Sequence, residues 1–106
     1  MSPFFSVVIP TYNQCELLKK AIQSVESQTF EDYEIIVIDN SSNDGTHDFL
    51  KDKKNIIYKK IRNNGVIAKS RNLGIENSKG KWICFLDTDD VWFKKKLEKT
   101  FNEINK

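Results

Sequence analysis

Several residue types are scarce in this sequence of 106 residues, and each shortage excludes a class of protein. The two cysteines, Cys15 and Cys84, are too few for a disulfide framework and do not form a metal-binding pair. We expect both thiols to be reduced and partly buried. No apolar run approaches the roughly 18 residues that a membrane span needs. The N-terminus also lacks the charged region, apolar stretch and cleavage site of a signal peptide.

Charge and glycine are limited as well. The formal net charge is only +2, which gives no reason to expect nucleic acid or an anionic membrane as the main partner. The four glycines form neither a Gly-x-Gly-x-x-Gly fingerprint nor a Walker loop. A bound phosphate would therefore need a metal ion to neutralise it. Taken together, these absences predict a cytoplasmic protein, with attachment to the inner face of a membrane through other sequence left open.

What the sequence does contain is an alternation of short apolar runs and helix-like segments. Hydrophobic residues make up 39% and charged residues 30%, as in a soluble globular domain with one modest core. Strands are predicted at residues 4–9, 33–38, 55–61 and 81–86, and helices after Asn13, from Thr46, and at 66–77 and 92–104. This order predicts an α/β fold with a parallel sheet covered by helices on both faces.

Two local signals set the expected ends of the first elements. Pro10 is expected to stop the first strand. Asn13 is expected to cap the first helix, with Glu16 three residues later as in a capping box.

Polar residues follow three of the predicted strands. Thr11 and Tyr12 come after the first strand, Asp39 ends the second, and Asp87 and Asp89 end the fourth. In an open parallel sheet these strand ends share one edge, which is where such sheets bind ligands. We therefore expect these residues to surround one site.

Three carboxylates lie close together in the stretch WICFLDTDD, at Asp87, Asp89 and Asp90. Such neighbours repel, and a divalent cation removes the conflict. Mg²⁺ or Mn²⁺ prefers hard oxygen ligands, and Mg²⁺ typically shares its shell between one or two carboxylates, waters and substrate phosphates. A D-x-D at a strand end thus predicts a metal–diphosphate site. The alternative is that Asp89 or Asp90 simply caps a helix starting at Val91.

The other polar residues also have two interpretations. Asp39 either accepts hydrogen bonds from a nucleobase or ribose, or initiates the turn NSSNDG. Tyr12 either stacks on a base or covers the sheet edge. Arg71 either offers its guanidinium to a phosphate or base, or forms a surface ion pair.

Two long segments resemble the family 2 inverting glycosyltransferases of the GT-A fold. The first is SVVIPTYNQCELLKKAIQSVESQTFEDYEIIVIDNSSNDGT, and the second, NNGVIAKSRNLGIENSKGKWICFLDTDD, ends in the D-x-D motif. The match spans nearly the whole chain, in order. The resemblance implies a Rossmann-like GT-A fold with a mostly parallel sheet, in which residues 1–106 are the N-terminal, donor-binding part of a single domain whose C-terminal part is missing.

The resemblance also implies roles for individual residues around a nucleotide-sugar donor, most often a UDP-sugar. Pro10, Thr11 and Tyr12 would line the base pocket. Asp39 would read the uracil, and Arg71 would approach the base or phosphates. Two further roles follow the D-x-D motif: Asp87 would lie by the ribose, and Asp89, with Asp87 beside it, would hold Mn²⁺ or Mg²⁺ on the diphosphate.

The implied reaction is transfer of the sugar, with inversion, to a hydroxyl of a saccharide or lipid-linked acceptor, as in polysaccharide biosynthesis. A general base would deprotonate that hydroxyl. The family takes its base from an acidic residue well downstream of the D-x-D. Glu98 and Glu103 follow the motif too closely, so no catalytic residue is assigned. A truncated sheet would leave an exposed edge, which makes homo-oligomerisation a further hypothesis.

Three rival functions share part of this pattern. A non-catalytic nucleotide-binding fragment or remnant would keep the donor site without turnover. A phosphoacceptor receiver has similar length and alternation, but it needs an acidic pair after its first strand, where this chain has Thr11 and Tyr12. A haloacid-type phosphatase needs further motifs beyond its D-x-D, and few residues follow Asp87.

Overall fold

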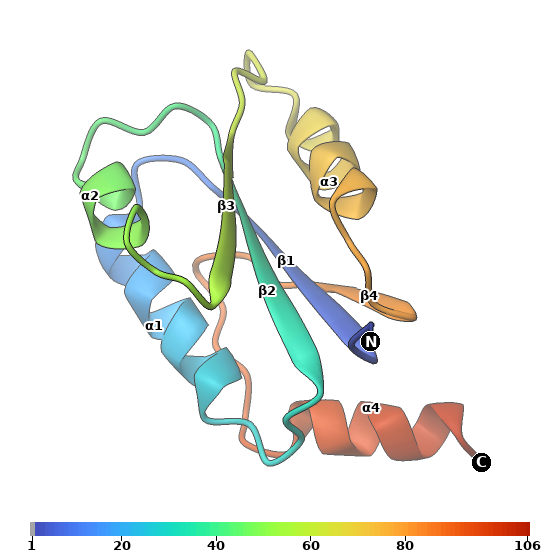
Figure 1. Cartoon of the computed structure of the whole chain (residues 1–106). Coiled ribbons are helices and arrows are strands. Elements are labelled where there is room, and N and C mark those ends of the chain that lie inside the picture. The colour runs from blue at the N-terminus through green and yellow to red at the C-terminus, as the bar shows by residue number, and fades with distance from the viewer. Residues whose placement is uncertain (1) are drawn as a thin grey trace.

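The computed structural model describes residues 2–106, which form strands and helices in strict alternation (Figure 1). The elements are β1 (Phe5–Thr11), α1 (Cys15–Glu26), β2 (Tyr33–Asp39), α2 (Thr46–Leu50), β3 (Ile56–Lys60), α3 (Ile67–Glu76), β4 (Trp82–Phe85) and α4 (Lys96–Ile104). All strand pairs are parallel, in the order β3-β2-β1-β4. The predicted parallel α/β sheet is confirmed.

Helices cover both faces of this sheet, as expected. Side chains alternate between the faces of a strand. On one face Val7 of β1 and Val37 of β2 pack with the apolar side of α1 and with Leu50 of α2. On the other face Val8 and Ile38 pack beneath α3. Figure 1 shows α1 and α2 on one side of the strands and α3 on the other.

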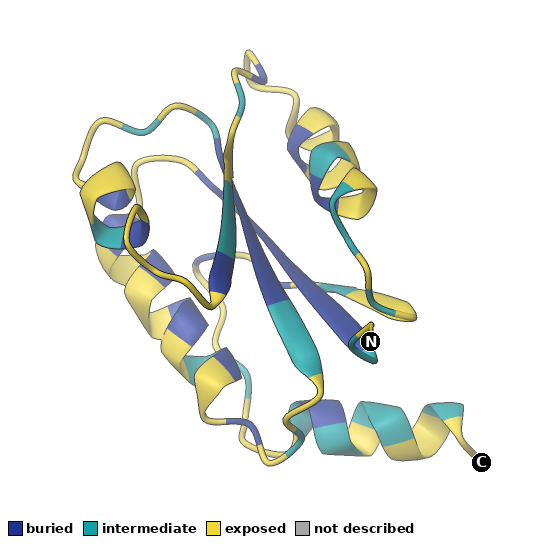
Figure 2. Cartoon of the chain, viewed as in Figure 1, coloured by how far each residue is buried: buried dark blue, intermediate teal, exposed yellow. Residues whose placement is uncertain are grey.

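Burial differs sharply between the strands. Almost all of β1 and most of β2 are buried, whereas β4 is largely exposed (Figure 2). The strand β4 pairs with β1 alone, so one edge of it is unpaired in the described residues. Trp82 and Phe85 are each more than two-fifths exposed. The core therefore lies around β1 and β2, and β4 borders it.

The first strand runs two residues past its predicted end. Pro10 and Thr11 continue the pairing of β1 with β2, opposite Ile38 and Asp39. The pairing of β1 with β4 ends earlier, at Val8. Beyond that point β1 has only one neighbour, so a residue without an N–H is accommodated as it would be on an edge strand. The prediction that Pro10 stops the strand was wrong.

A close approach between α3 and β1 fixes the height of the helix above the sheet. A Cβ atom built on Gly74 would lie 2.3 Å from Cγ1 of Val8. Glycine at this position therefore lets the helix backbone rest on the Val8 side chain. Arg71 lies one turn before Gly74, so this contact also sets the position of Arg71.

The last helix begins four residues later than predicted, at Lys96. Residues 92–95 are held to the segment after α1 instead: Gln28 Nε2 donates to the Phe93 carbonyl (2.8 Å), and Thr29 N donates to the Lys94 carbonyl (3.0 Å). Gln28 Oε1 also accepts from Leu97 N in the first turn of α4. Because the helix begins at Lys96, neither Asp89 nor Asp90 caps it, and that alternative for the acidic cluster was wrong.

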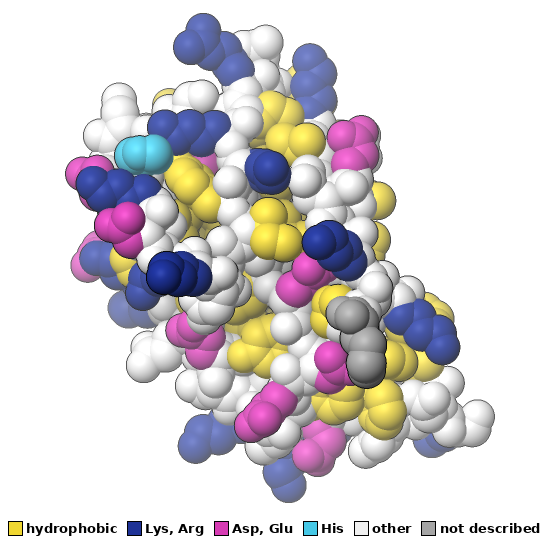
Figure 3. All heavy atoms as spheres, viewed as in Figure 1, with side chains coloured by type: hydrophobic (Ala, Val, Ile, Leu, Met, Phe, Trp, Pro, Cys, Tyr) yellow, Lys and Arg dark blue, Asp and Glu magenta, His cyan; other side chains and the backbone are white. Residues whose placement is uncertain are grey.

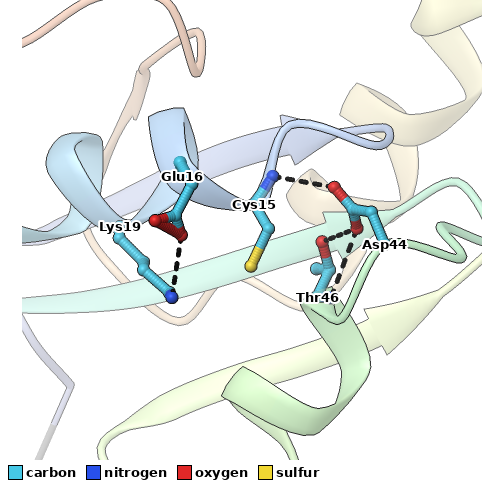
Figure 4. A network of polar contacts seen from close by, with 5 residues as sticks. All are labelled: Cys15, Glu16, Lys19, Asp44 and Thr46. Carbon is cyan, nitrogen blue, oxygen red and sulfur yellow. Dashed lines mark hydrogen bonds and ion pairs between the residues drawn. The ribbon is translucent and has the colours of Figure 1, made fainter.

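The start of α1 also differs from the prediction. The N-cap residue is Gln14, and no side chain of the capping-box kind bonds there. Instead, Cys15 N donates to Asp44 Oδ2 (3.0 Å), a carboxylate from the loop after β2, and Glu16 pairs with Lys19 (Figure 4). The other Asp44 oxygen accepts from Thr46 Oγ1 and N. The Asp44 carboxylate thus accepts hydrogen bonds from the backbone N–H groups at the start of both α1 and α2.

The surface and the thiols match the compositional expectations. Basic and acidic side chains are interspersed on the face in Figure 3, in keeping with the small net charge. Both cysteines are free; Cys15 is buried and Cys84 partly buried. Within residues 2–106, no helix has the length and apolarity required to traverse a bilayer.

Candidate functional site: a pocket at the carboxyl edge of the sheet

A pocket of about 430 Å³ lies where the carboxyl ends of β1, β2 and β4 meet the start of α3. This volume falls within the usual range for small-molecule sites. Six residues that the sequence singled out line it: Pro10, Thr11, Tyr12, Arg71, Asp87 and Asp89. The parallel topology therefore brings together groups that are up to about 80 positions apart in the chain.

The acidic cluster forms the β4 side of this pocket. Asp87, Asp89 and Asp90 are all exposed, and each offers a carboxylate oxygen within 4.8 Å of the others. Asp87 and Asp89 line the pocket, while the intervening Thr88 is buried and its hydroxyl donates to Gln14 Oε1. Three exposed carboxylates at this spacing are the hard oxygen donors that Mg²⁺ and Mn²⁺ prefer, so the residues fit a divalent cation.

Arg71 extends from α3 toward the same cluster. Its Nη2 lies 3.5 Å from Asp87 Oδ1, and its guanidinium carbon lies 5.7 Å from the centre of the Phe85 ring. Both partners of the ion pair are about half exposed, so the pair contributes little to stability. Its main consequence is position: the guanidinium stands beside the carboxylates, where a cation and an anion would meet.

Thr11 and Tyr12 form the β1 side. Tyr12 is 56% exposed, so one face of its ring is free to stack on a planar ligand. Thr11 is only 5% exposed, and among the described residues its hydroxyl oxygen is the buried side-chain atom that has no hydrogen-bond partner. Buried polar groups are normally bonded, so the hydroxyl of Thr11 is an exception among the described residues.

Asp39 lies apart from the pocket lining. Its side chain is fully buried, and both carboxylate oxygens are engaged: Oδ1 accepts from Ser42 N (3.0 Å) and Oδ2 from Tyr58 Oη (2.7 Å). Burial and the negative Asp39 together raise the pKa of Tyr58 well above its usual value. Asp39 therefore holds the β2 end to β3.

The loops after β1 and β2 are bonded to each other around the pocket. Asn13 N donates to Ser42 Oγ and Asn43 N donates to Asn13 Oδ1, each at 2.8 Å. Hydrogen bonds to Asp44, first from the Thr46 hydroxyl and then from Cys15 N, hold the pKa of Asp44 below its ordinary value. These contacts fix the loop that follows Asp39.

Sequence reasoning missed two asparagines in the pocket wall, Asn40 and Asn63. Asn63 is 4% exposed; its N donates to Asn40 Oδ1, its Nδ2 to Ser70 Oγ, and its Oδ1 accepts from Gly65 N. Both residues lie in stretches that the sequence marked only as turns. A signal was present for Asn40, since an amide directly after a buried strand can bond to a neighbouring loop. Asn63 lies three positions beyond the end of β3, which is mostly exposed or partly exposed, and it had no such signal.

The family of this chain follows from its match to a family model. Residues 6–106 match the model described as glycosyl transferase family 2. The chain belongs to glycosyl transferase family 2. The match covers the strands, the pocket and the acidic cluster, and it decides against the receiver-like and phosphatase-like alternatives.

Two curated relatives support this assignment. An uncharacterised glycosyltransferase of Rickettsia bellii (strain RML369-C) is 45% identical over 96 residues, which cover 88% of this chain and 14% of the relative. The poly(ribitol-phosphate) beta-N-acetylglucosaminyltransferase TarP of Staphylococcus aureus (strain N315) is 39% identical over 103 residues, or 92% of this chain and 32% of the relative. The chain therefore spans well under half the length of these relatives.

Solved structures show the same fold. The chain superimposes on S. aureus TarS 1-349 in complex with UDP-GlcNAc with a TM-score of 0.86 and 29% identity, over 99% of this chain and 31% of that one. This similarity confirms the fold of the sheet and helices, and the family rests on the match of the family model.

Proposed function

We propose that this chain is the donor-binding part of a glycosyltransferase that moves a sugar from a nucleotide diphosphate to an acceptor hydroxyl, with inversion. The observation that carries the proposal is the pocket, where an exposed aromatic ring, a guanidinium and the carboxylates of Asp87 and Asp89 converge at the carboxyl edge of the sheet. These are the groups needed for a base, a diphosphate and its cation, respectively.

In this proposal the nucleotide lies across the pocket from β1 to β4. The base lies against Tyr12, beside Pro10 and Thr11, and its ring stacks on the exposed tyrosine face. Arg71 approaches the phosphates, and Asp87 lies by the ribose. Asp39 supports the pocket from within the protein, because its hydrogen bonds with Ser42 N and the Tyr58 hydroxyl hold the loop after β2 in place.

Asp89, with Asp87, is proposed to hold a divalent cation, Mn²⁺ or Mg²⁺. When bound, such a cation supplies positive charge that stabilises a leaving diphosphate. The fit rests on the carboxylate oxygens, which lie within 4.8 Å of one another. In the described residues, Arg71 is the one basic side chain that pairs with them.

The donor is proposed to be a UDP-sugar. The structurally similar TarS binds UDP-GlcNAc, and TarP is named for transfer of N-acetylglucosamine to poly(ribitol-phosphate). By extension, the acceptor is a saccharide or lipid-linked polymer at the cytoplasmic side of the membrane. Acceptor binding and the general base are assigned to sequence beyond the acidic cluster, and residues 1–106 to the N-terminal part of one domain.

The test is calorimetric titration of the chain with UDP, GDP, CDP and ADP, each with and without Mn²⁺. Binding that requires Mn²⁺ and favours particular bases is expected. Absence of binding by every nucleotide would contradict a donor site within these residues. Binding without turnover of any donor, even when the chain is joined to an acceptor-binding part, would favour the rival function of a non-catalytic nucleotide-binding module.

A further inference from the structure

The turn between β3 and α3 carries the one Asn-Gly pair of the sequence, Asn64–Gly65 (Figure 1). Val66 N donates to the Asn63 carbonyl (2.9 Å), which closes the turn. Asn64 and Gly65 occupy its two central positions, with φ angles of 53° and 82°. Positive φ at both positions is characteristic of a type I′ turn, for which Asn-Gly is a preferred sequence.

These two residues can react with each other. The backbone nitrogen of Gly65 can attack Cγ of the Asn64 side chain and close a succinimide ring. The new N–Cγ bond replaces the Cγ–Nδ2 bond, whose electrons leave with Nδ2 as ammonia, together with the proton that Gly65 N gives up. Water then opens the ring at either carbonyl and leaves aspartate or isoaspartate at position 64. Glycine favours the attack because it has no Cβ to obstruct it.

The surroundings of the pair leave room for this reaction. Asn64 and Gly65 are both exposed, so water can reach the ring. Apart from the adjacent residues, no heavy atom lies within 4 Å of a Cβ built on Gly65. The reactive groups are therefore not shielded by packing.

The attacking nitrogen is held by a hydrogen bond instead. Gly65 N donates to Oδ1 of Asn63 at 2.8 Å. That acceptor is itself fixed, because Asn63 is 4% exposed and its Nδ2 donates to Ser70 Oγ of α3 (2.9 Å). Attack on Asn64 requires the Gly65 peptide group to turn, which breaks its bond to Asn63. The Asn63 side chain therefore opposes the reaction.

We propose that Asn64 is a site of spontaneous deamidation, and that the Asn63 side chain controls its rate. The reaction proceeds in molecules whose bond between Gly65 N and Asn63 Oδ1 has opened. The folded chain is therefore modified more slowly than the unfolded chain. The reaction consumes only water and releases ammonia. The inference goes beyond the proposed function, because it rests on the turn and its hydrogen bonds alone.

Deamidation at this position would change the wall of the candidate site. Gly65 lines the main pocket and also a second hollow, which Asn64 and Arg62 line with it. Aspartate at position 64 adds a negative charge to that hollow. Isoaspartate also lengthens the backbone immediately before Gly65, because the chain then continues through Cγ.

The experiment measures deamidation of Asn64 by peptide mapping and mass spectrometry while the folded chains are incubated at mildly alkaline pH. Asn63→Ala removes the acceptor of Gly65 N and should react about fivefold faster than the parent, or more. Asn63→Asp keeps an acceptor oxygen and should stay near the parental rate. Val25→Ala weakens the core beneath α1 and controls for a general loss of stability, so it should also stay near that rate.

The same incubation in urea gives the reference rates. The parent and Asn63→Ala should then react equally fast, since the Asn64–Gly65 pair is unchanged and the turn is lost. Thermal unfolding shows whether each variant is folded in the absence of urea. If Asn63→Ala does not fold, Ser70→Ala takes its place. It frees the other end of the Asn63 side chain, and a smaller acceleration is expected.

Three outcomes would overturn the proposal. Equal rates in the folded parent and in the variant that loosens Asn63 would remove the role of that side chain. An equal acceleration in Val25→Ala or in Asn63→Asp would do the same, because neither change removes the acceptor of Gly65 N. Absence of deamidation at Asn64 in the unfolded parent would refute the site itself.

Discussion

Two acidic strand ends lie at the same edge of the sheet, on either side of β1, and they differ in almost every physical respect. At the end of β2, Asp39 is fully buried and bonded through both oxygens. At the end of β4, Asp87, Asp89 and Asp90 are exposed and close together, and within residues 2–106 the one side chain paired with them is Arg71. One end is closed and serves the fold, and the other is open to a ligand.

The difference teaches that the position of a carboxylate in the topology does not decide its task. Burial and the supply of donors decide it. A buried carboxylate needs hydrogen bonds to offset its lost hydration, and β3 and the following loop provide them. The β4 end has no such cover, because β4 is the border strand of the sheet. Carboxylates left without donors can take up a cation.

The largest expected effect is at the open end. Asp89→Asn should abolish the Mn²⁺-dependent part of nucleotide binding, because it removes one anionic ligand from the cluster. The melting temperature should stay the same, since Asp89 is exposed and its side chain has no hydrogen bond or ion pair within residues 2–106. Calorimetry measures the nucleotide binding, and thermal unfolding measures the melting temperature. Asp52→Asn is the control at an exposed position outside the pocket. Unchanged binding would show that Asp89 is not a metal ligand.

The matching change at the closed end is Asp39→Ala. It should lower the free energy of unfolding by about 3 kcal/mol, because it leaves the Tyr58 hydroxyl and Ser42 N without their acceptor. Urea unfolding measures this loss. A variant as stable as the parent, but unable to bind nucleotide, would place Asp39 with the open carboxylates and break the comparison.

A smaller effect at the closed end depends on pH. The pKa of Tyr58 is raised by burial and by Asp39 from a usual value of 10. Above pH 10 the unfolded chain loses this proton while the folded chain keeps it, so stability should fall as pH rises. Tyr58→Phe should cost about 1 kcal/mol at neutral pH and make that fall less steep.

Tyr33, whose pKa burial also raises, should maintain part of the decline above pH 10 in the Tyr58→Phe variant. Tyr12→Phe serves as the control for removal of a tyrosine hydroxyl at an exposed position. Unfolding free energies measured from pH 8 to 11 give the slopes. Equal slopes in the parent and Tyr58→Phe would mean that the Asp39 contact is not maintained in solution.

The smallest expected effect concerns Asp44, an exposed carboxylate that nevertheless has a structural task. Asp44→Ala should cost about 1 kcal/mol at neutral pH, the usual cost of losing a helix cap. Because its pKa lies below the ordinary 3.8, the contribution is present above that pH and disappears as pH falls through it. The two unfolding curves should therefore converge in acid.

Asp48→Ala is the matched control for Asp44, since Asp48 forms only an exposed pair with Lys51 in the same loop and helix region. It should change stability by a few tenths of a kcal/mol at most. If Asp48→Ala and Asp44→Ala were equivalent, the carboxylate of Asp44 would not be capping α1.

Sequence reasoning reached the edge of the sheet but not the orientation of each side chain there. Alternating apolar runs predict parallel strands, and parallel strands bring Thr11, Arg71 and Asp87 to one edge. Asp39 and Asn40 are successive residues at the end of β2, and only one of them can face the pocket. Hydrophobic patterning does not predict which one, because Ile35–Ile38 are apolar on both faces of the strand.

Boundaries set by distant partners were also beyond the sequence. The start of α1 depends on Asp44, and the start of α4 depends on Gln28. Both contacts are side chain to backbone, across 29 and 69 positions. A local capping rule considers only the neighbouring residues, so it placed the cap at Asn13 and began the last helix too early.

The pairing of β4 with β1 has a consequence for how the site comes into being. Phe5 stands opposite Trp82, so β4 can join the sheet only after most of the chain has been made. A chain emerging from the ribosome can first assemble β1, β2 and β3, which carry Tyr12 and Asn40. The acidic residues join the sheet last, because the pairing of β4 with β1 links residues that are far apart in the sequence and has a high contact order. The β1 and β2 side of the pocket is thus assembled before the acidic cluster joins it in the history of each molecule.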